Sequence, residues 1–190
     1  RTRPLPVNRR QGPEYLEVQR PAYELLRDHL EYQHADGQSE AFAAERETEA
    51  EPLLVGRLAT KLKEINEGLT DDGVRQAIAA LRQPLAVALI DANETCHRLL
   101  SRWVTVEEAR NGKVAGRSVR FIDFDNPHNN EFLVVEEFTV KGPRFTRRLD
   151  LVVFVNGIPI VAIECKDPAD QHGITHAVHD LLTYQDAGMG

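Results

Sequence analysis

Apolar residues recur at helical spacing through the first half of the chain. Stripes of this kind occupy four stretches, residues 22–32, 53–65, 70–81 and 85–100. Pro21 suits the first turn of the first helix, where a backbone N–H needs no partner, and Thr70 is a candidate N-cap of the third. The pattern predicts a helical portion over residues 14–100.

From residue 101 onward the pattern changes to β-branched and aromatic runs, which predict strands around residues 119–124 and 132–140. The runs 149–155 and 158–165 flank Asn156-Gly157, the dipeptide most typical of a tight β-hairpin. Both strands of this hairpin are apolar on both faces, which predicts a central position in a sheet covered on two sides. With a helical pattern over residues 174–185, the chain is expected to be an α/β protein with a mixed central sheet flanked by helices.

Two polar segments, one before and one after the first predicted helix, differ in character. Residues 1–13 contain three prolines and four arginines and are predicted to form a basic irregular arm, followed by one domain over residues 14–190 with its sheet and catalytic core at about 101–186. Residues 33–51 are acidic and polar and are predicted to form a mobile or helical surface insertion. The chain starts without methionine and stops just after a helical pattern, so we expect a fragment of a longer protein.

Composition narrows the class of protein further. The 190 residues carry a formal charge of −7, which taken alone argues against a nucleic-acid partner. The charge is uneven, however, at +3 over residues 1–20 and −6 over residues 21–60. Two cysteines cannot build a disulfide framework, which predicts a reducing, cytoplasmic location. No apolar run is long enough to suggest a membrane span.

Charged residues stand at the ends of the two apolar hairpin strands. Asp150 begins one strand, and Glu164 and Lys166 end the other, on one face of it because they are two residues apart. Burying these charges is unfavourable unless a cation or mutual pairing compensates. Carboxylates of Asp150 and Glu164 with the backbone carbonyl of Cys165 suit Mg²⁺, and Lys166 could act on the attacking water or on phosphate charge. A structural salt-bridge cluster is the alternative interpretation.

The hairpin register provides a test of this site. A two-residue loop without a bulge places Asp150 opposite Ile163 and sends Glu164 to the other face. A three-residue loop, or one bulge near Pro159, brings Val155 opposite Pro159 and Asp150 opposite Glu164. We therefore predict a one-residue shift supplied by the loop or by a bulge.

The segment 147–166, which reads RRLDLVVFVNGIPIVAIECK, resembles the nuclease core of type I restriction enzyme R (restriction) subunits, members of the PD-(D/E)xK superfamily. The runs 121–124 and 129–135 and the helical stretch 53–81 are also similar, so the resemblance covers residues 15–186. It implies a restriction-endonuclease-like fold with Asp150, Glu164 and Lys166 as catalytic residues. Leu149 stands where the superfamily is named for proline.

The resemblance also implies an activity and partners. It predicts Mg²⁺-dependent cleavage of double-stranded DNA in a complex with methylation and specificity subunits. A membrane is not an expected partner. In that family an ATP-driven motor follows the nuclease domain in the same chain, so the resemblance predicts one after residue 190. No Gly-x-x-x-x-Gly-Lys-Ser/Thr motif occurs in this chain, so ATP hydrolysis is not expected in these residues. The alternatives are a non-catalytic docking domain with a nuclease fold, and a stand-alone structure-specific nuclease of the same superfamily.

Several further residues are candidates for the site. Arg147 and Arg148 lead into Asp150 and are expected to contact the DNA backbone. The family often carries a Gln-x-x-x-Tyr pair after the lysine; Tyr184 matches it, but Asp180 stands in place of the glutamine. Its early-helix glutamate has two candidates here, Glu17 and Glu24, of which Glu17 is preferred. A zinc site formed by the closely spaced His172, His176 and His179 is the less favoured interpretation of those residues.

Overall fold

The computed structural model describes residues 9–82, 89–110, 112–142 and 146–188. Its helices are α1 (Arg20–Glu24), α2 (Glu40–Ala43), α3 (Val55–Ile65), α4 (Asp71–Arg82), α5 (Leu89–Ser101) and α6 (Gly173–Gly188), with short 3₁₀ turns at Arg9–Gln11 and Pro127–Asn129. Its strands are β1 (Gln33–Asp36), β2 (Val104–Arg110), β3 (Lys113–Val119), β4 (Phe132–Lys141), β5 (Thr146–Val155) and β6 (Ile158–Ile163).

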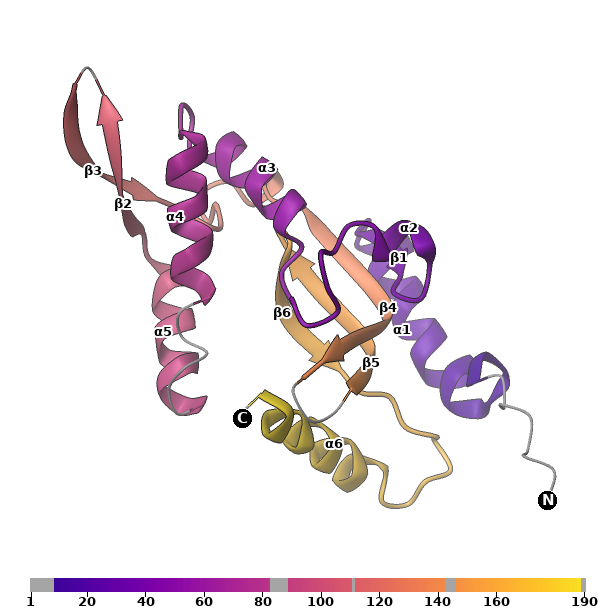
Figure 1. Cartoon of the computed structure of the whole chain (residues 1–190). Helices are drawn as coiled ribbons and strands as arrows, with labels where there is room; N and C mark the ends of the chain where they lie inside the picture. The colour runs from indigo at the N-terminus through magenta and orange to yellow at the C-terminus, as the bar shows by residue number, and fades with distance from the viewer. Residues whose placement is uncertain (1–8, 83–88, 111, 143–145, 189–190) are drawn as a thin grey trace.

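A four-stranded sheet with the order β1-β4-β5-β6 forms the centre of the molecule. β1 is parallel to β4, whereas β4–β5 and β5–β6 are antiparallel. The hairpin β2–β3 forms a separate two-stranded sheet, which lies with α4 and α5 on one side, while α1 lies on the other and α6 below the end of β6 (Figure 1). The predicted α/β class with a mixed central sheet flanked by helices is confirmed, and the arrangement is consistent with a restriction-endonuclease-like fold.

The N-terminal helix is longer than the apolar pattern predicts. It runs from Glu14 to His29, with α1 between two π-helical segments, Glu14–Gln19 and Leu25–His29. Pro21 therefore lies inside a continuous helical stretch, although still in the first turn of α1. The extension brings Gln19 onto the buried side of this helix.

The acidic segment 33–51 is not merely a surface insertion. Residues 33–36 form β1, which pairs in parallel with residues 133–136 of β4. α2 follows and buries Phe42, which is 2% exposed. The helix α2 agrees with the predicted helical insertion, but strand β1 was missed because its side chains show no apolar alternation. Its place is set by pairing with β4.

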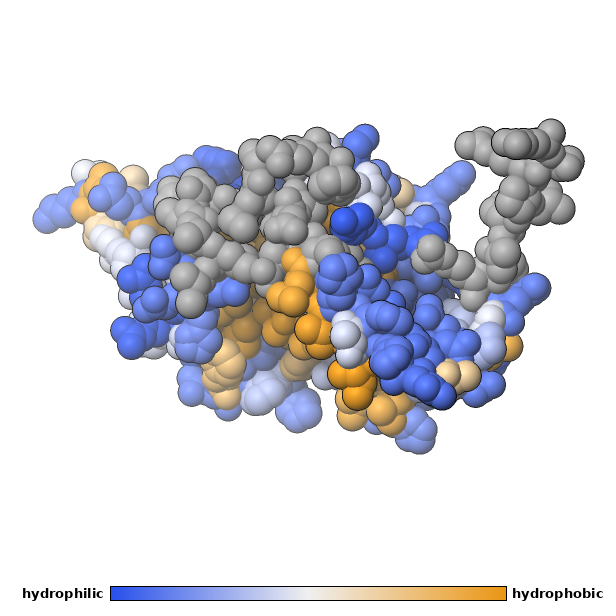
Figure 2. All heavy atoms as spheres, turned by 90° about the horizontal axis from the view of Figure 1, so that it is seen from below, coloured by the Kyte–Doolittle hydropathy of each residue, from blue (hydrophilic) through white to orange (hydrophobic). Residues whose placement is uncertain are grey.

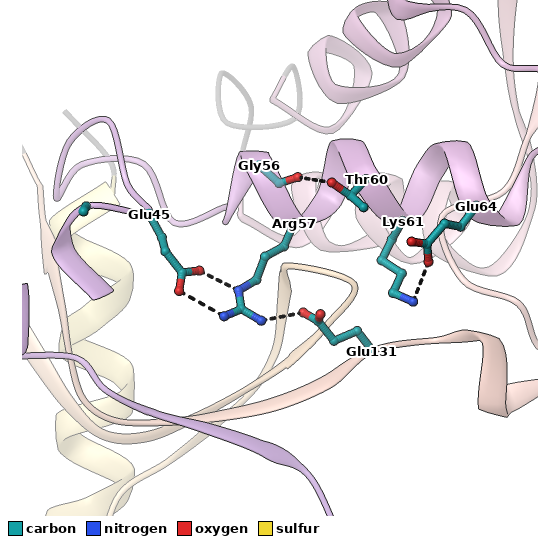
Figure 3. A pocket seen from close by; sticks show the side chains of 8 residues that line it. Glu45, Gly56, Arg57, Thr60, Lys61, Glu64 and Glu131 are labelled. Atoms are coloured by element: carbon teal, nitrogen blue, oxygen red, sulfur yellow. Dashed lines mark hydrogen bonds and ion pairs between the residues drawn. The ribbon is translucent and has the colours of Figure 1, made fainter. Parts of the chain in front are cut away.

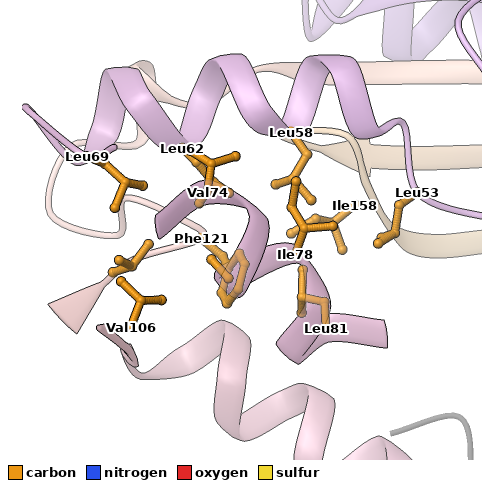
Figure 4. Close-up of a cluster of buried hydrophobic side chains, with 12 residues drawn as sticks. Leu53, Leu58, Leu62, Leu69, Val74, Ile78, Leu81, Val106, Phe121 and Ile158 are labelled. Atoms are coloured by element: carbon orange, nitrogen blue, oxygen red, sulfur yellow. The ribbon is translucent and has the colours of Figure 1, made fainter. Parts of the chain in front are cut away.

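Three groups of buried side chains join these layers. The first lies between α3, α4 and the β2–β3 hairpin, and Ile158 of β6 connects it to the central sheet (Figure 4). The second packs Phe42 and Leu54 on one face of β4 and β5. The third packs Tyr23 of α1 against Leu151 on the opposite face. Both faces of the middle strands are thus covered, as the apolar runs predict.

The turn between β5 and β6 consists of Asn156 and Gly157, both in the left-handed region with φ of 54° and 79°. The Asn156 amide is fully buried and donates to the Phe121 carbonyl at 2.9 Å and to Asn130 Oδ1 at 2.8 Å. Its own oxygen accepts the Glu131 N–H at 2.8 Å. The predicted tight hairpin is confirmed, and this network ties it to the loop before β4.

A β-bulge in β6 shifts the hairpin register. Val155 lies opposite Ile158, so the loop has two residues and Val155 does not face Pro159 as predicted. The partner of Val153 is nevertheless Val161, which leaves Ile160 as the extra residue. The predicted one-residue shift is therefore confirmed, with a bulge rather than a longer loop as its source.

Two other expectations are corrected. β6 is an edge strand of the described sheet, with Ile160 and Val161 43% and 45% exposed, so only β5 of the hairpin is central. The strand predicted over 119–124 is wrong: β3 covers Lys113–Val119, residues 120–124 form a loop, and Phe121 packs into the core from that loop. Among the described residues, no helix has the length and apolar character needed to cross a membrane.

Candidate active site

Asp150 lies beside the residues that follow β6. The last pair of the β5–β6 ladder joins Leu151 to Ile163, so the next residues, Asp150 and Glu164, come opposite each other. Asp150 is 9% exposed, and its Oδ2 accepts a 2.7 Å hydrogen bond from the N–H of Cys165. This hydrogen bond therefore joins Asp150 to the segment after β6 that carries Glu164 and Lys166.

Cys165 is a core residue, as expected, with 2% exposure. Burial raises the pKa of its thiol to about 12, and the charges of Asp150, Glu14 and Glu164 add to the effect. The thiol stays protonated at neutral pH and is unsuited to nucleophilic attack. Its part in the site is that of its peptide group, whose N–H orients Asp150.

Glu164 and Lys166 are half-buried and lie just beyond β6, which ends at Ile163 rather than at Cys165. Lys166 Nζ is 2.6 Å from Asp180 Oδ2 on α6. Burial pulls the pKa of Lys166 down, but the hydrogen bond and charge of Asp180, with the charges of Glu14 and Glu164, raise it above its ordinary value. The side chain is therefore a fixed cation at neutral pH.

Helix α6 begins directly against this lysine. A Cβ added at Gly173 would stand 3.2 Å from the Cβ of Lys166, closer than most such contacts. Asp180 lies two turns further along the same helix. α6 thus touches both the stem and the charged end of Lys166.

The early-helix acid is placed differently from the assignment made on sequence. Glu17 is exposed, and within the part of the chain that the structure describes no hydrogen bond or ion pair joins it to the site. Glu14, one turn earlier, is half-buried, and its charge acts on Lys166 and Cys165. Glu14 is therefore the acid of this helix whose field reaches the site.

The candidate DNA-binding residues are only partly described. Arg147 and Arg148 are half-buried in β5. The Nε of Arg148 is 2.7 Å from Glu137 Oε2, a carboxylate that is 8% exposed, so this arginine balances a buried charge. Tyr184 belongs to α6, but its side chain lies outside the described residues.

The donor chemistry of the site suits a hard divalent cation. Asp150 lies within β5 rather than at its start as predicted, and Glu164 lies just beyond the end of β6; both offer carboxylate oxygens, and the peptide of Cys165 offers a carbonyl oxygen. A Mg²⁺ ion there could polarise a phosphoryl oxygen and lower the pKa of a bound water. The residues present therefore fit the cation that the sequence predicts.

A softer metal is not supported by the described part of the chain. No group of three or more His, Cys, Asp or Glu side chains arranged to hold a metal ion occurs there, so the candidate Mg²⁺ site also relies on two carboxylates and a main-chain oxygen rather than on three such side chains. His172 and His176 stand near each other with ring centroids 6.2 Å apart, but His176 Nδ1 lies 2.7 Å from Asp170 Oδ2. These residues organise the loop that leads into α6.

A hollow of about 550 Å³ lies away from the site, between α3 and the start of β4 (Figure 3). Its cations are already paired, because Arg57 binds Glu45 at 2.9 Å and Glu131 at 3.0 Å, and Lys61 binds Glu64 at 2.7 Å. It therefore offers no spare positive charge to a phosphate. None of the predicted site residues lines it.

Sequence reasoning missed one residue that contacts the site. Gln19, 3% exposed, donates from Nε2 to the main-chain carbonyl of Asp150 at 3.2 Å and to Glu137 Oε1 at 3.3 Å. The available signal was its spacing, since Gln19, Tyr23 and Leu26 share one helical stripe. A polar residue on an apolar stripe indicates a buried polar partner.

The fold is consistent with the class of restriction-endonuclease-like domains, and Asp150, Glu164 and Lys166 lie on β5 and on the segment just after β6. The particular family follows from comparison with known proteins. The model of the type I restriction enzyme R protein N terminus matches residues 13–189, and the chain belongs to this family.

Curated relatives agree with this assignment. The chain is 36% identical over 149 residues to the putative type I restriction enzyme MjaIXP endonuclease subunit of Methanocaldococcus jannaschii, covering 73% of the chain and 14% of that protein. It is 28% identical over 136 residues to the type I restriction enzyme HindI endonuclease subunit of Haemophilus influenzae, covering 70% of the chain and 13% of that protein. The chain thus corresponds to a small part of these relatives.

Proposed function

We propose that this domain is the Mg²⁺-dependent nuclease of a type I restriction endonuclease subunit and hydrolyses DNA phosphodiester bonds. The observation that carries the proposal is the 2.7 Å hydrogen bond from the Cys165 N–H to Asp150 Oδ2. It connects Asp150, which lies within β5, to the segment just after β6 that carries Glu164 and Lys166, and so supports a shared site for the three residues. A salt-bridge cluster alone would not need both carboxylates beside one another.

Each residue has a distinct role in this proposal. Asp150 and Glu164 hold the cation, with the Cys165 carbonyl as a third oxygen ligand. Bound Mg²⁺ supplies Lewis-acid chemistry at the phosphate. Lys166, kept protonated beside Asp180, neutralises charge that develops on the phosphate rather than acting as a general base.

The partners follow from the relatives, whose printed names are endonuclease subunits of type I restriction enzymes. We expect double-stranded DNA as substrate, methylation and specificity subunits as partners, and an ATP-driven motor in a part of the subunit outside these residues. With Asp180 at the site and a formal charge of −7, the domain itself is expected to bind DNA weakly and to depend on the complex for delivery.

Cleavage of plasmid DNA by the full-length subunit in its complex tests the proposal. Asp150→Asn and Lys166→Met should each slow cleavage by about 100-fold or more, because each removes a group that binds the cation or the reacting phosphate. Chelation of Mg²⁺ should abolish cleavage. Asp125→Asn is the matched control, since the Asp125 side chain is 87% exposed and pairs with Arg120 in a distant loop. Unchanged cleavage by Asp150→Asn would show the assignment to be wrong.

A docking function is supported by a different observation. Ile174, Val178 and Leu182 follow one another at helical spacing on α6 and are 85%, 50% and 53% exposed. Figure 2 views the molecule from below, the side on which α6 lies in Figure 1, and shows groups of apolar side chains among the polar ones on that face. A domain that only docks would cleave equally well with Asp150→Asn but lose assembly with Val178→Asp, so the two variants separate the two functions.

A further inference from the structure

The ladder between β4 and β5 is interrupted at the candidate active site. Glu136 pairs with Leu151 and Phe138 pairs with Leu149, so Glu137 and Asp150 face each other, yet they form no ladder pair. The cause is the backbone of Glu137, whose φ is 57°, a conformation rare for a residue other than glycine. Strained backbone of this kind persists only where its surroundings hold it.

The side chain of Gln19 takes the place of the missing ladder contact. Its Nε2 donates to the carbonyl oxygen of Asp150 at 3.2 Å and to Glu137 Oε1 at 3.3 Å. All three residues are less than about 10% exposed, so the bonds form where water competes little. A helix from the far end of the sequence thereby fixes the main chain at the candidate metal ligand.

Two further side chains, those of Arg148 and Gln38, bind Glu137. Its Oε2 lies 2.7 Å from Arg148 Nε, and its carbonyl oxygen accepts a 2.8 Å hydrogen bond from Gln38 Nε2. Gln19 consequently donates into a frame that is itself fixed. Rigid support of a ligand by its neighbours is what sets the affinity of a metal site.

We propose that Gln19 is a positioning residue for the cation site: its amide holds the main chain of Asp150 so that the carboxylate stays beside the Cys165 N–H and Glu164. The inference rests on the proposed function, because it concerns the same cation and the same cleavage reaction. Gln19 acts through Asp150 and does not itself touch the cation or the substrate.

The test compares Gln19→Met with wild type in the full-length subunit within its complex. Methionine keeps the volume but removes the donor. Mg²⁺ affinity, measured by calorimetric titration without nucleotide and with Asp150→Ala as baseline, should fall about 10-fold, in the range found for supporting partners of metal ligands. Cleavage at low Mg²⁺ should fall by a similar factor and recover at high Mg²⁺, whereas the DNA concentration giving half-maximal rate should stay unchanged.

Gln76→Met is the matched control. Gln76 of α4 also bridges a helix to a strand, because its side chain donates to the Glu107 carbonyl of β2 at 2.8 Å and accepts the Glu107 N–H at 2.9 Å. This contact lies far from the candidate site. Its loss should affect thermal stability without changing Mg²⁺ affinity. If Gln19→Met does not fold, Gln19→Asn, which retracts the amide by one methylene, gives the same comparison.

Three outcomes decide the matter. Weaker Mg²⁺ binding by Gln19→Met but not by Gln76→Met supports the positioning role. Equal Mg²⁺ affinity in both variants and wild type overturns it while leaving the proposed function standing, provided that Asp150→Ala is inactive. Full cleavage and unchanged Mg²⁺ binding by Asp150→Ala overturn the proposed function and this inference with it.

Discussion

The ammonium of Lys166 lies 2.6 Å from the Oδ2 of Asp180, an ion pair that connects the loop after β6 with helix α6. The Lys166 side chain is 22% exposed and that of Asp180 41%, so the pair adds little to stability, about 0–1 kcal/mol. Its consequence is geometric, since it fixes where the cationic end of Lys166 lies.

Asp180→Asn is expected to separate catalysis from DNA binding. Without the carboxylate Lys166 loses its fixed position, so the rate at saturating DNA should fall about 10-fold, within the usual effect of misplacing a catalytic group. The DNA concentration at half-maximal rate should not rise, because a negative charge near the phosphates has been removed. Steady-state cleavage kinetics measure both quantities.

Asp170→Asn is the control for this variant, because Asp170 pairs with His176 at the start of the same helix without contacting Lys166. It should leave both kinetic quantities within about twofold of wild type, a change too small to reflect a lost catalytic contact. An equal loss of rate in the two variants would mean that α6 as a whole, and not the Asp180 carboxylate, determines the activity.

Gly157→Ala should destabilise the domain strongly. A Cβ there would stand 2.7 Å from the Leu54 carbonyl oxygen and 3.0 Å from the Leu58 amide nitrogen, and φ is 79°. Backbone atoms cannot move aside cheaply, so we expect a loss of about 2–4 kcal/mol in the free energy of unfolding, measured by urea denaturation.

Gly56→Ala provides the opposite case. Gly56 lies in the first turn of α3, is exposed, and an added Cβ meets nothing within 4 Å. The same substitution should stabilise by about 0.5–1 kcal/mol through helix propensity. If both glycine variants lost stability equally, the close approach of the β5–β6 turn to α3 would be refuted.

The comparison of sequence and structure shows what local pattern can predict. Asn156-Gly157 specifies its turn through its own backbone preference, and the need to place Asp150 beside Glu164 predicts the bulge that the structure contains. Strand β1 could not be found this way, because residues 33–36 are polar and become a strand only by pairing with β4. Local propensity was overridden there by a contact distant in sequence.

The residues of the candidate site were predictable from local pattern, but the contacts that they receive from distant helices were not. Asp150 stands just before one apolar run and Glu164 and Lys166 just after the next, where charge is conspicuous in the sequence, although β5 extends four residues beyond Asp150 toward the N-terminus. Gln19 and Asp180 reach the site from helices at opposite ends of the chain; spacing indicates that Gln19 is buried, but it does not show which residue either side chain contacts. Contacts of this kind depend on how the N-terminal helical stretch Glu14–His29 and α6 pack against the sheet, which is a property of the whole fold.

The stability of the fold at acid pH should depend on Glu108. Its carboxylate is 3% exposed at the junction of α4 and β2. It accepts hydrogen bonds from the hydroxyl and the N–H of Thr70 at 2.6 and 2.7 Å, and Arg117 lies 3.2 Å away. The bonds from Thr70, aided by Arg117, lower the pKa of Glu108 to about 2. The ordinary pKa of glutamate in an unfolded chain is about 4.3.

Because the folded-state pKa is the lower one, the charged form of Glu108 stabilises the fold at pH values above the unfolded pKa, and this contribution is lost as the pH falls toward the folded pKa. Glu108→Gln should therefore cost about 1–3 kcal/mol at pH 7, the usual effect of removing charge-assisted hydrogen bonds. The difference from wild type should narrow steadily as the pH falls through the acid range. Urea unfolding of both proteins at neutral and acidic pH measures it, and a difference independent of pH would show that Glu108 contributes by shape and not by charge.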